Sequence, residues 1–148
     1  MIWQSDDAVA GDAADVVEIL GNWVAETPWM PKLHSTTEDL WFANHLIASQ
    51  KVRVTRAPEV VGFLAQLGPE VNALYLAPRA RGAGIGRALL DEAKASEQDR
   101  ALWTFQANVA ALRFYKCQGF VVTEYTDGEG NAEHLPDVRL VWQAVTHG

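Results

Sequence analysis

The sequence predicts a single domain of the mixed α/β class. Segments in which apolar residues alternate, as in strands, are interspersed with segments in which apolar residues recur at helical spacing. No segment repeats another, and no low-complexity linker divides the chain. The 148 residues suit one compact domain with its own core. We therefore expect one domain over residues 1–148.

The chain is expected to begin with a short strand and a helix. The strand includes Ile2 to Gln4, and Asp12 is a suitable N-cap for the helix, which should end near Trp23. Residues 27–34 contain two prolines and no clear period, which predicts a loop. The apolar stripe of this first helix is Val16, Val17, Leu20 and Trp23.

A second helix and a hairpin follow. Ser35–Glu38 is a capping box, which predicts a helix start. Residues 51–56 and 60–66 alternate as strands do, and Ala57-Pro58-Glu59 between them predicts a hairpin. The inner stripe expected for the helix is Leu40, Ala43 and Ile47.

The second half predicts alternating strands and helices. A strand over Val71–Ala77 leads into a glycine-rich turn and a helix that runs to about Ser96. A strand over residues 101–106 precedes a helix that begins at Asn108. The last two expected strands, which pair with each other, are Phe120–Tyr125 and Asp137–Trp142.

The glycine-rich turn has the features of a phosphate site. Gly82, Gly84 and Gly86 allow backbone angles that other residues avoid and let an anion approach the main chain. Because a helix begins here, its unpaired N–H groups and partial positive charge face the same point. Arg81 and Arg87 can add charge-assisted hydrogen bonds. The sequence therefore predicts a site for a phosphate or pyrophosphate.

The spacing of the turn excludes two common nucleotide sites. A P-loop requires Lys and Ser or Thr after its last glycine, whereas Arg87 and Ala88 follow Gly86. A dinucleotide fingerprint requires its third glycine one position later and an acidic residue after a second strand. Neither requirement is met.

A second motif lies downstream, at residues 108–120. Ala111, Phe114 and Tyr115 recur at helical spacing, and Gly119 ends the helix before a strand. This segment resembles the Asn-x-x-Ala-x-x-Phe-Tyr-x-x-x-Gly-Phe pattern of GCN5-related N-acetyltransferases (GNAT). Arg81–Gly86 resembles that family's Arg/Gln-x-x-Gly-x-Gly/Ala segment, and the order of strands and helices agrees over nearly the whole chain.

The resemblance implies a GNAT fold, a mixed and mostly antiparallel sheet of about six or seven strands flanked by about four helices. It implies acetyl-CoA as co-substrate and direct transfer of the acetyl group to a primary amine, for which a small molecule is the first expectation. The strand before the turn would diverge from the next strand, and the thioester arm would lie between them. The residues that would hold the cofactor are Leu74, Tyr75 and Leu76 through their main chain, Arg81, Gly82, Ala83, Gly84, Ile85, Gly86 and Arg87 of the turn, and Asn108 and Phe114.

The same resemblance assigns two catalytic groups. The Leu76 amide would stabilise the oxyanion, and Tyr115 would protonate the departing thiolate. A phenol remains protonated at neutral pH, because its pKa of about 10 exceeds the value of about 8.5 for a thiol.

The general base stays open in the sequence. Some family members place a glutamate on the strand where this chain has Trp103, and its absence argues against acetylation of peptide N-termini. Glu70, His34, a water relay and an already neutral amine are the alternatives. His45, His134 and His147 have no supporting context.

Two segments are candidates for the acceptor site. Trp29 and His34 lie where the family forms one wall of the acceptor cleft, although Trp29 and Met30 could equally fill the core. Residues 126–136 are acidic, which suits a cationic acceptor or simply a solvated loop. A calcium loop is excluded, because Ala132 and Val138 occupy positions that need glycine and glutamate.

Composition limits the partners. The 12 Lys and Arg residues against 19 Asp and Glu give a net charge of −7, which disfavours nucleic acid and anionic membranes. One cysteine, Cys117, permits no internal disulfide and is expected to be half-buried on a helix. We expect a soluble cytoplasmic protein without a metal, and a monomer and a homodimer are both compatible with the sequence. The alternative functions are a coenzyme A sensor without catalysis and an acetyltransferase for proteins, peptides or charged tRNA.

Overall fold

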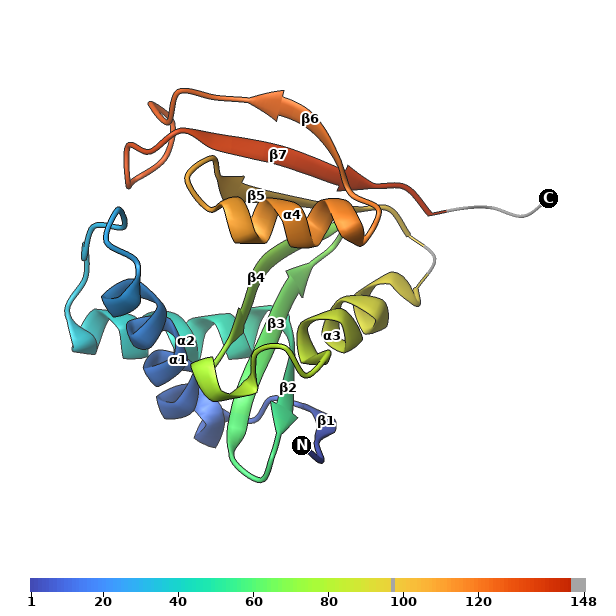
Figure 1. The fold of residues 1–148 in the computed structure, drawn as a ribbon. Helices are drawn as coiled ribbons and strands as arrows, with labels where there is room; N and C mark the ends of the chain where they lie inside the picture. The colour runs from blue at the N-terminus through green and yellow to red at the C-terminus, as the bar shows by residue number, and fades with distance from the viewer. Residues whose placement is uncertain (97, 145–148) are drawn as a thin grey trace.

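The computed structural model describes residues 1–96 and 98–144 and has seven strands in one sheet, with four α-helices (Figure 1). The predicted mixed α/β architecture is confirmed. His147 lies outside the described residues. The strands are β1 (Gln4–Asp7), β2 (Lys51–Arg56), β3 (Val60–Leu67), β4 (Glu70–Leu76), β5 (Arg100–Phe105), β6 (Val121–Tyr125) and β7 (Asp137–Trp142). The helices are α1 (Ala13–Glu26), α2 (Thr36–Ser49), α3 (Ile85–Lys94) and α4 (Val109–Cys117), with short 3-10 helices η1 (Ala10–Asp12) and η2 (Pro78–Ala80).

The strand order is β1-β2-β3-β4-β5-β7-β6. Every neighbouring pair is antiparallel except β4 and β5, which are parallel and joined through α3. Helices α1 and α3 cover opposite faces of the sheet. Two neighbouring residues of β4 show this, because successive strand side chains point to opposite sides of a sheet. Tyr75 contacts Trp23 of α1, whereas its neighbour Leu76 lies close to Gly86 of α3.

The predicted first helix is longer than expected and begins differently. Helix α1 continues to Glu26, one turn beyond Trp23, and ends where Thr27 hydrogen-bonds back to the Trp23 carbonyl. Asp12 occupies the N-cap position, but its side chain makes no cap hydrogen bond to α1. Its carboxylate instead accepts from the Val9 N–H and from both terminal nitrogens of Arg56, at 2.9 Å each. The stronger charge-assisted pair with Arg56 takes the place of the cap.

Other local predictions need smaller corrections. The first strand is Gln4–Asp7 rather than Ile2 to Gln4, because Gln4 pairs with Arg56 of β2. The capping box of α2 is confirmed, since Ser35 and Glu38 bond reciprocally. Helix α2 buries Ala43 and Leu46, whereas Leu40 is 42% exposed. Cys117 is exposed rather than half-buried.

Strands β4 and β5 diverge, and this fork positions the site. Their only paired residues are Glu70 and Ala101, at the start of both strands. Beyond that pair, β4 continues against β3 while β5 continues against β7. The polar main-chain groups on the inner edge of β4 are therefore left without a strand partner.

Two arginines fasten the closed end of the fork. Arg100, at the start of β5, is 1% exposed and donates to the carbonyls of Ala93 and Gly68 at 2.7 Å each, and to the Ser96 hydroxyl. It thereby joins the end of α3 to the turn between β3 and β4. Arg139 of β7 forms a two-point ion pair with Glu70 of β4, across β5.

We expect Arg100→Ala to lower the free energy of unfolding by about 3 kcal/mol or more, because buried carbonyls lose their donor. Arg100→Lys should fall between wild type and alanine, since one ammonium cannot reproduce the guanidinium fork. Urea unfolding followed by tryptophan fluorescence measures both. Arg113→Ala, at an exposed position of α4, is the control and should change stability by less than about 0.5 kcal/mol. Equal stability of the Arg100 and Arg113 variants would contradict the role of Arg100.

Candidate active site

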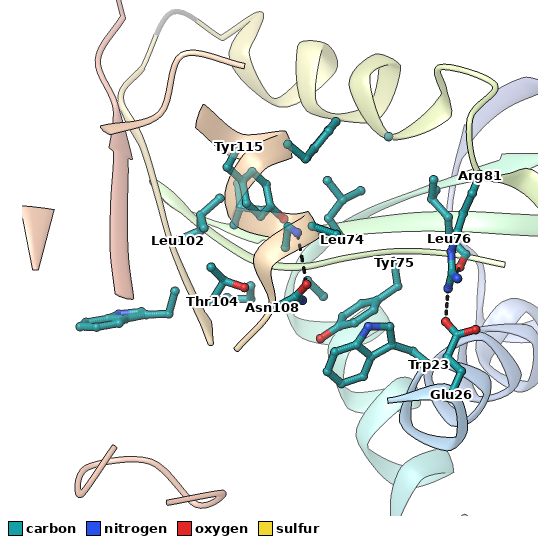
Figure 2. Close-up of a pocket in the computed structure, with 18 residues that line it drawn as sticks. Trp23, Glu26, Leu74, Tyr75, Leu76, Arg81, Leu102, Thr104, Asn108 and Tyr115 are labelled. Atoms are coloured by element: carbon teal, nitrogen blue, oxygen red, sulfur yellow. Dashed lines mark hydrogen bonds and ion pairs between the residues drawn. The ribbon is translucent and has the colours of Figure 1, made fainter. Parts of the chain in front are cut away.

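A cavity of about 420 Å³ occupies the fork between β4 and β5. Its walls come from β4, β5 and α4, with the end of α1 and the start of α3 at its margins (Figure 2). In Figure 2 the ring of Tyr115 lies between Leu102 of β5 and Leu74 of β4. Tyr75 and Trp23 lie together on the opposite side of β4. Tyr115 and the unpaired edge of β4 therefore line the same cavity.

The main-chain groups of β4 face alternately toward β3 and toward the cavity. The Ala77 N–H donates to the Val61 carbonyl, and hydrogen-bonded pairs recur at every second residue of an antiparallel ladder. Tyr75 is thus bonded to β3, whereas the N–H and C=O groups of Leu74 and Leu76 face the fork. The Leu76 carbonyl accepts from Arg81 at 3.4 Å, which agrees with this orientation. Leu74 and Leu76 fit the predicted main-chain role, but Tyr75 contributes its side chain.

The glycine turn forms an open helix start. Gly82 and Gly84 have φ angles of +78° and +85°, which favour glycine over other residues. Helix α3 begins at Ile85, and no side chain caps it, so its first N–H groups are unpaired. The side chain of Ile85 is buried, so Ala83 and Ile85 can offer a ligand mainly their main chain. This arrangement can accept an anion.

Gly86 has neither an unusual backbone angle nor a contact too close for a side chain. A Cβ atom at this position would lie 3.5 Å from the Phe114 ring and 3.7 Å from a methyl group of Leu76. Phe114 and Gly86 both line the cavity. The third glycine of the motif thus lies where α3 meets α4 at the mouth of the fork, and a Cβ atom there would make only ordinary contacts.

The two predicted arginines differ in their surroundings. The Arg81 guanidinium forms an ion pair with Glu26 of α1, at the margin of the cavity (Figure 2). Arg87 is exposed and lies 3.8 Å from Asp91, one turn further along α3. Both arginines thus have a carboxylate partner, and the pair of Arg87 with Asp91 is the longer and more exposed of the two.

Tyr115 is buried, with 8% of its surface exposed, and its ring contacts Phe114 and Phe120. Burial, with a smaller contribution from Tyr75, raises the pKa of the Tyr115 phenol well above its ordinary value. The hydroxyl has no hydrogen-bond partner among the described residues, and Tyr115 lines the cavity. Tyr115 is thus a protonated donor throughout the physiological pH range.

Asn108 has a structural role that the motif alone did not reveal. It is the N-cap of α4, and its side-chain oxygen accepts from the Ala111 N–H at 3.2 Å (Figure 2). Asn108 also lines the cavity, and its amide NH₂ group is left to donate to a ligand.

The predicted acceptor residues do not reach the fork. Trp29 is half-buried and packs edge-on against Trp23 and Phe105, with ring centroids 5.8 and 5.7 Å apart, so it supports the aromatic wall from behind. His34 lines a separate cavity of about 360 Å³ between α1 and the loop that follows it. Its ring nitrogen lies 3.4 Å from Glu38. Neither residue lines the cavity that contains Tyr115.

The candidate bases named from the sequence are poorly placed. Glu70 is held by Arg139 at the closed end of the fork and does not line the cavity. Trp103, at the position of the missing glutamate, is half exposed and lies under the Arg139 guanidinium, 5.4 Å from the ring centroid. Trp103 and Thr104 line both the fork cavity and a second cavity of about 540 Å³.

The second cavity lies under the loop between β6 and β7. Its walls include Phe105 of β5 and Glu133 of the loop. The sequence places Glu133 in the acidic segment 126–136, a candidate for the acceptor site, but does not distinguish it from the other carboxylates there. Nothing in the local pattern of Glu26 distinguishes it from a solvated carboxylate. Their positions depend on contacts between distant segments.

No group of three or more His, Cys, Asp or Glu side chains within residues 1–96 and 98–144 is arranged to hold a metal ion. In the same part of the chain, none of the helices has the length and apolar character that crossing a membrane requires.

Comparisons with known proteins agree with this geometry. The acetyltransferase (GNAT) domain family matches residues 42–122, more than half of the chain. The chain is 32% identical to the peptidyl-lysine N-acetyltransferase YjaB of Salmonella typhimurium over 91 residues, which are 62% of this chain and 63% of that protein. YjaB of Escherichia coli is 30% identical over 62% of each chain. The match thus spans less than two thirds of these relatives.

Solved structures share the fold. The apo form of YjaB from Escherichia coli superposes with a TM-score of 0.79 and 22% identity, covering 98% of this chain and 100% of that chain. The acetyltransferase yncA of Salmonella typhimurium, solved with acetyl-CoA, gives 0.72 and 23%, covering 100% and 97%.

We expect Asn108→Ala to lower the free energy of unfolding by about 1 kcal/mol through loss of the cap. Asn108→Ser keeps a cap acceptor but removes the amide donor, so it should be nearly as stable as wild type. Both variants should bind coenzyme A about three- to tenfold more weakly, as loss of one hydrogen bond implies. Thermal unfolding and calorimetric titration test the two effects separately. Wild-type affinity in Asn108→Ser would show that Asn108 only caps the helix.

Proposed function

Because the chain belongs to the GNAT acetyltransferase family, we propose that it transfers an acetyl group from acetyl-CoA to a primary amine. The observation that carries the proposal is the fork between β4 and β5. It places a free strand edge, an uncapped helix start and a protonated phenol around one cavity. Acetyl-CoA requires such groups, because it carries a pyrophosphate, a pantetheine arm with amide groups, and a thioester.

The residues present suit coenzyme A. The N–H groups at the start of α3, with Arg87, would hold the pyrophosphate. The facing main-chain groups of Leu74 and Leu76 would pair with the amides of the pantetheine arm, in the manner of an added strand. Asn108 would donate its amide to the same arm. Acetyl-CoA supplies the activated acetyl group.

Two groups of this chain would then assist the transfer. The Leu76 N–H faces the cavity and would stabilise the negative charge that develops on the thioester oxygen. The Tyr115 hydroxyl would donate a proton to the departing thiolate. Burial of the phenol keeps this proton in place until the thiolate forms.

For the acceptor, we propose a lysine-type amine. The related YjaB proteins are named peptidyl-lysine N-acetyltransferases, which favours a lysine side chain in a peptide or protein over the free small amine expected first. A net charge of −7 agrees with a cationic acceptor. The absence of a carboxylate at Trp103 argues further against peptide α-amines.

We expect the protein to release free thiol from acetyl-CoA when given a lysine-containing peptide with a blocked N-terminus. Mass spectrometry should locate the acetyl group on the lysine side chain. A peptide with a free N-terminus and no lysine should react at least tenfold more slowly, and free lysine and diamines test the small-amine alternative. Preference for the lysine-free peptide would contradict the proposed acceptor.

A second candidate is a coenzyme A sensor without catalysis, which the replacement of a strand carboxylate by Trp103 favours. Tight binding of acetyl-CoA together with only slow hydrolysis, and no product with any amine, would support the sensor. Acetyl transfer to any amine at ordinary enzymatic rates would exclude it.

We expect Tyr115→Phe to lower kcat about 100-fold, because general acid catalysis typically contributes at least this factor. The affinity for coenzyme A should change less than about twofold, since the ring and its packing remain. Tyr125→Phe, at an exposed position of β6, is the matched control and should retain wild-type turnover. Stopped-flow measurement of acetyl transfer ensures that chemistry is observed. Unchanged turnover in Tyr115→Phe would remove Tyr115 from this role.

A further inference from the structure

The loop between β6 and β7 is fixed by its own side chains. Asp137 accepts from the Thr126 hydroxyl and from the Asn131 amide, the latter at 3.3 Å. Asn131 also exchanges two hydrogen bonds with the main chain of Leu135. Asp127 accepts from the Glu129 N–H at 3.0 Å. Asp127 of the loop and Asp137 at the start of β7 therefore have structural partners.

Glu133 differs from these residues. No described residue forms a hydrogen bond or an ion pair with its carboxylate. Glu133 is half-buried and lines both the cavity under the loop and the cavity beside α1. Glu133 therefore lies between the two cavities, and its carboxylate has no ion-pair partner among the described residues.

The cavity under the loop adjoins the proposed reaction centre, and Glu133 lines this neighbouring cavity rather than the fork cavity itself. It shares Trp103 and Thr104 with the fork cavity that contains Tyr115. Burial raises the pKa of Tyr75, and the negative charge of Glu133 raises it further, so Glu133 acts on the phenol that forms one wall of the fork.

The other carboxylates near the fork are already engaged. Glu26 pairs with Arg81, and Glu70 pairs with Arg139. An engaged carboxylate must break its ion pair before it can take a proton, whereas Glu133 need not. Aromatic walls at Trp103 and Phe105 beside Glu133 also suit a cationic side chain with an apolar stem.

We propose that Glu133 binds the ammonium group of the acceptor and accepts the proton that this group must lose before it attacks the thioester. The inference rests on the proposed acetyl transfer and assigns the base that the sequence leaves open. Glu133 thus replaces, from a loop, the carboxylate that other family members carry on the strand at the position of Trp103.

The ammonium gives one proton to Glu133, and the lone pair of the resulting amine forms the C–N bond to the acetyl carbon. The C–S bond breaks, and the thiolate takes the proton of Tyr115. The new amide nitrogen loses its second proton, which restores the Tyr115 phenol, and Glu133 releases its proton to solvent.

Several titratable groups face Glu133 from the elements around it. His34 and Lys32 precede α2 and line the same cavity beside α1, and Asp39 belongs to α2. Asp137 lies at the start of β7 and lines the cavity under the loop. Tyr75 of β4 is the phenol whose pKa the charge of Glu133 raises. His34 lines the same cavity as Glu133, so its contribution must be separated from that of Glu133.

The test compares Glu133→Gln with Glu129→Gln, which removes the same charge from an exposed position of the same loop. The blocked lysine peptide is the acceptor, and kcat/KM is measured from pH 6.5 to pH 10. We expect Glu133→Gln to lose about 100-fold at pH 7. The loss should shrink toward pH 10, where lysine with a pKa of about 10.4 supplies its own neutral amine. Glu129→Gln should stay within about twofold of wild type.

Further measurements exclude a merely structural effect. Glu133→Gln should bind coenzyme A and hydrolyse acetyl-CoA as wild type does, and Glu133→Asp should recover part of the activity. His34→Gln should keep the wild-type pH profile. The inference is overturned if Glu133→Gln matches Glu129→Gln, or if its loss is the same at every pH. Absence of transfer by the wild-type protein would instead refute the proposed function, and the inference with it.

Discussion

The divergence of β4 and β5 is the constraint on which the rest of this molecule depends. A parallel pair that stays together would satisfy its own main chain and leave no room for a ligand. Here the pair meets only at Glu70 and Ala101, and Arg100 and Arg139 hold that end closed. The strands therefore open into a cavity without loosening the sheet, since β3 and β7 continue to pair with them.

The two faces of the fork carry different chemistry. Helices α3 and α4 bring the glycine-rich turn and the Tyr115 phenol to one side, where burial keeps the phenol protonated. On the other side lie aromatic rings and the loop that carries Glu133. A thioester held along the edge of β4 would lie between a proton donor and an acidic entrance for an amine.

Much of the fold and the cofactor side could be predicted, because both rest on local patterns. Gly82 and Gly84 indicate positive φ angles, and Ser35 with Glu38 indicates a helix start. Predictions failed where a distant partner competes with a local one. Asp12 forms an ion pair with Arg56 rather than capping α1. Leu40 lies on the exposed side of α2.

The sequence by itself determined the order of the elements, the turn before α3 and the motif that carries Tyr115, since each follows from neighbouring residues. Only the tertiary structure decided which groups are available. In the tertiary structure Glu70 forms an ion pair with Arg139, and Arg81 forms one with Glu26. The main chain of Tyr75 pairs with β3. Glu133 has no partner among the described residues. Availability of a charge depends on contacts between segments far apart in the chain, and no local pattern encodes it.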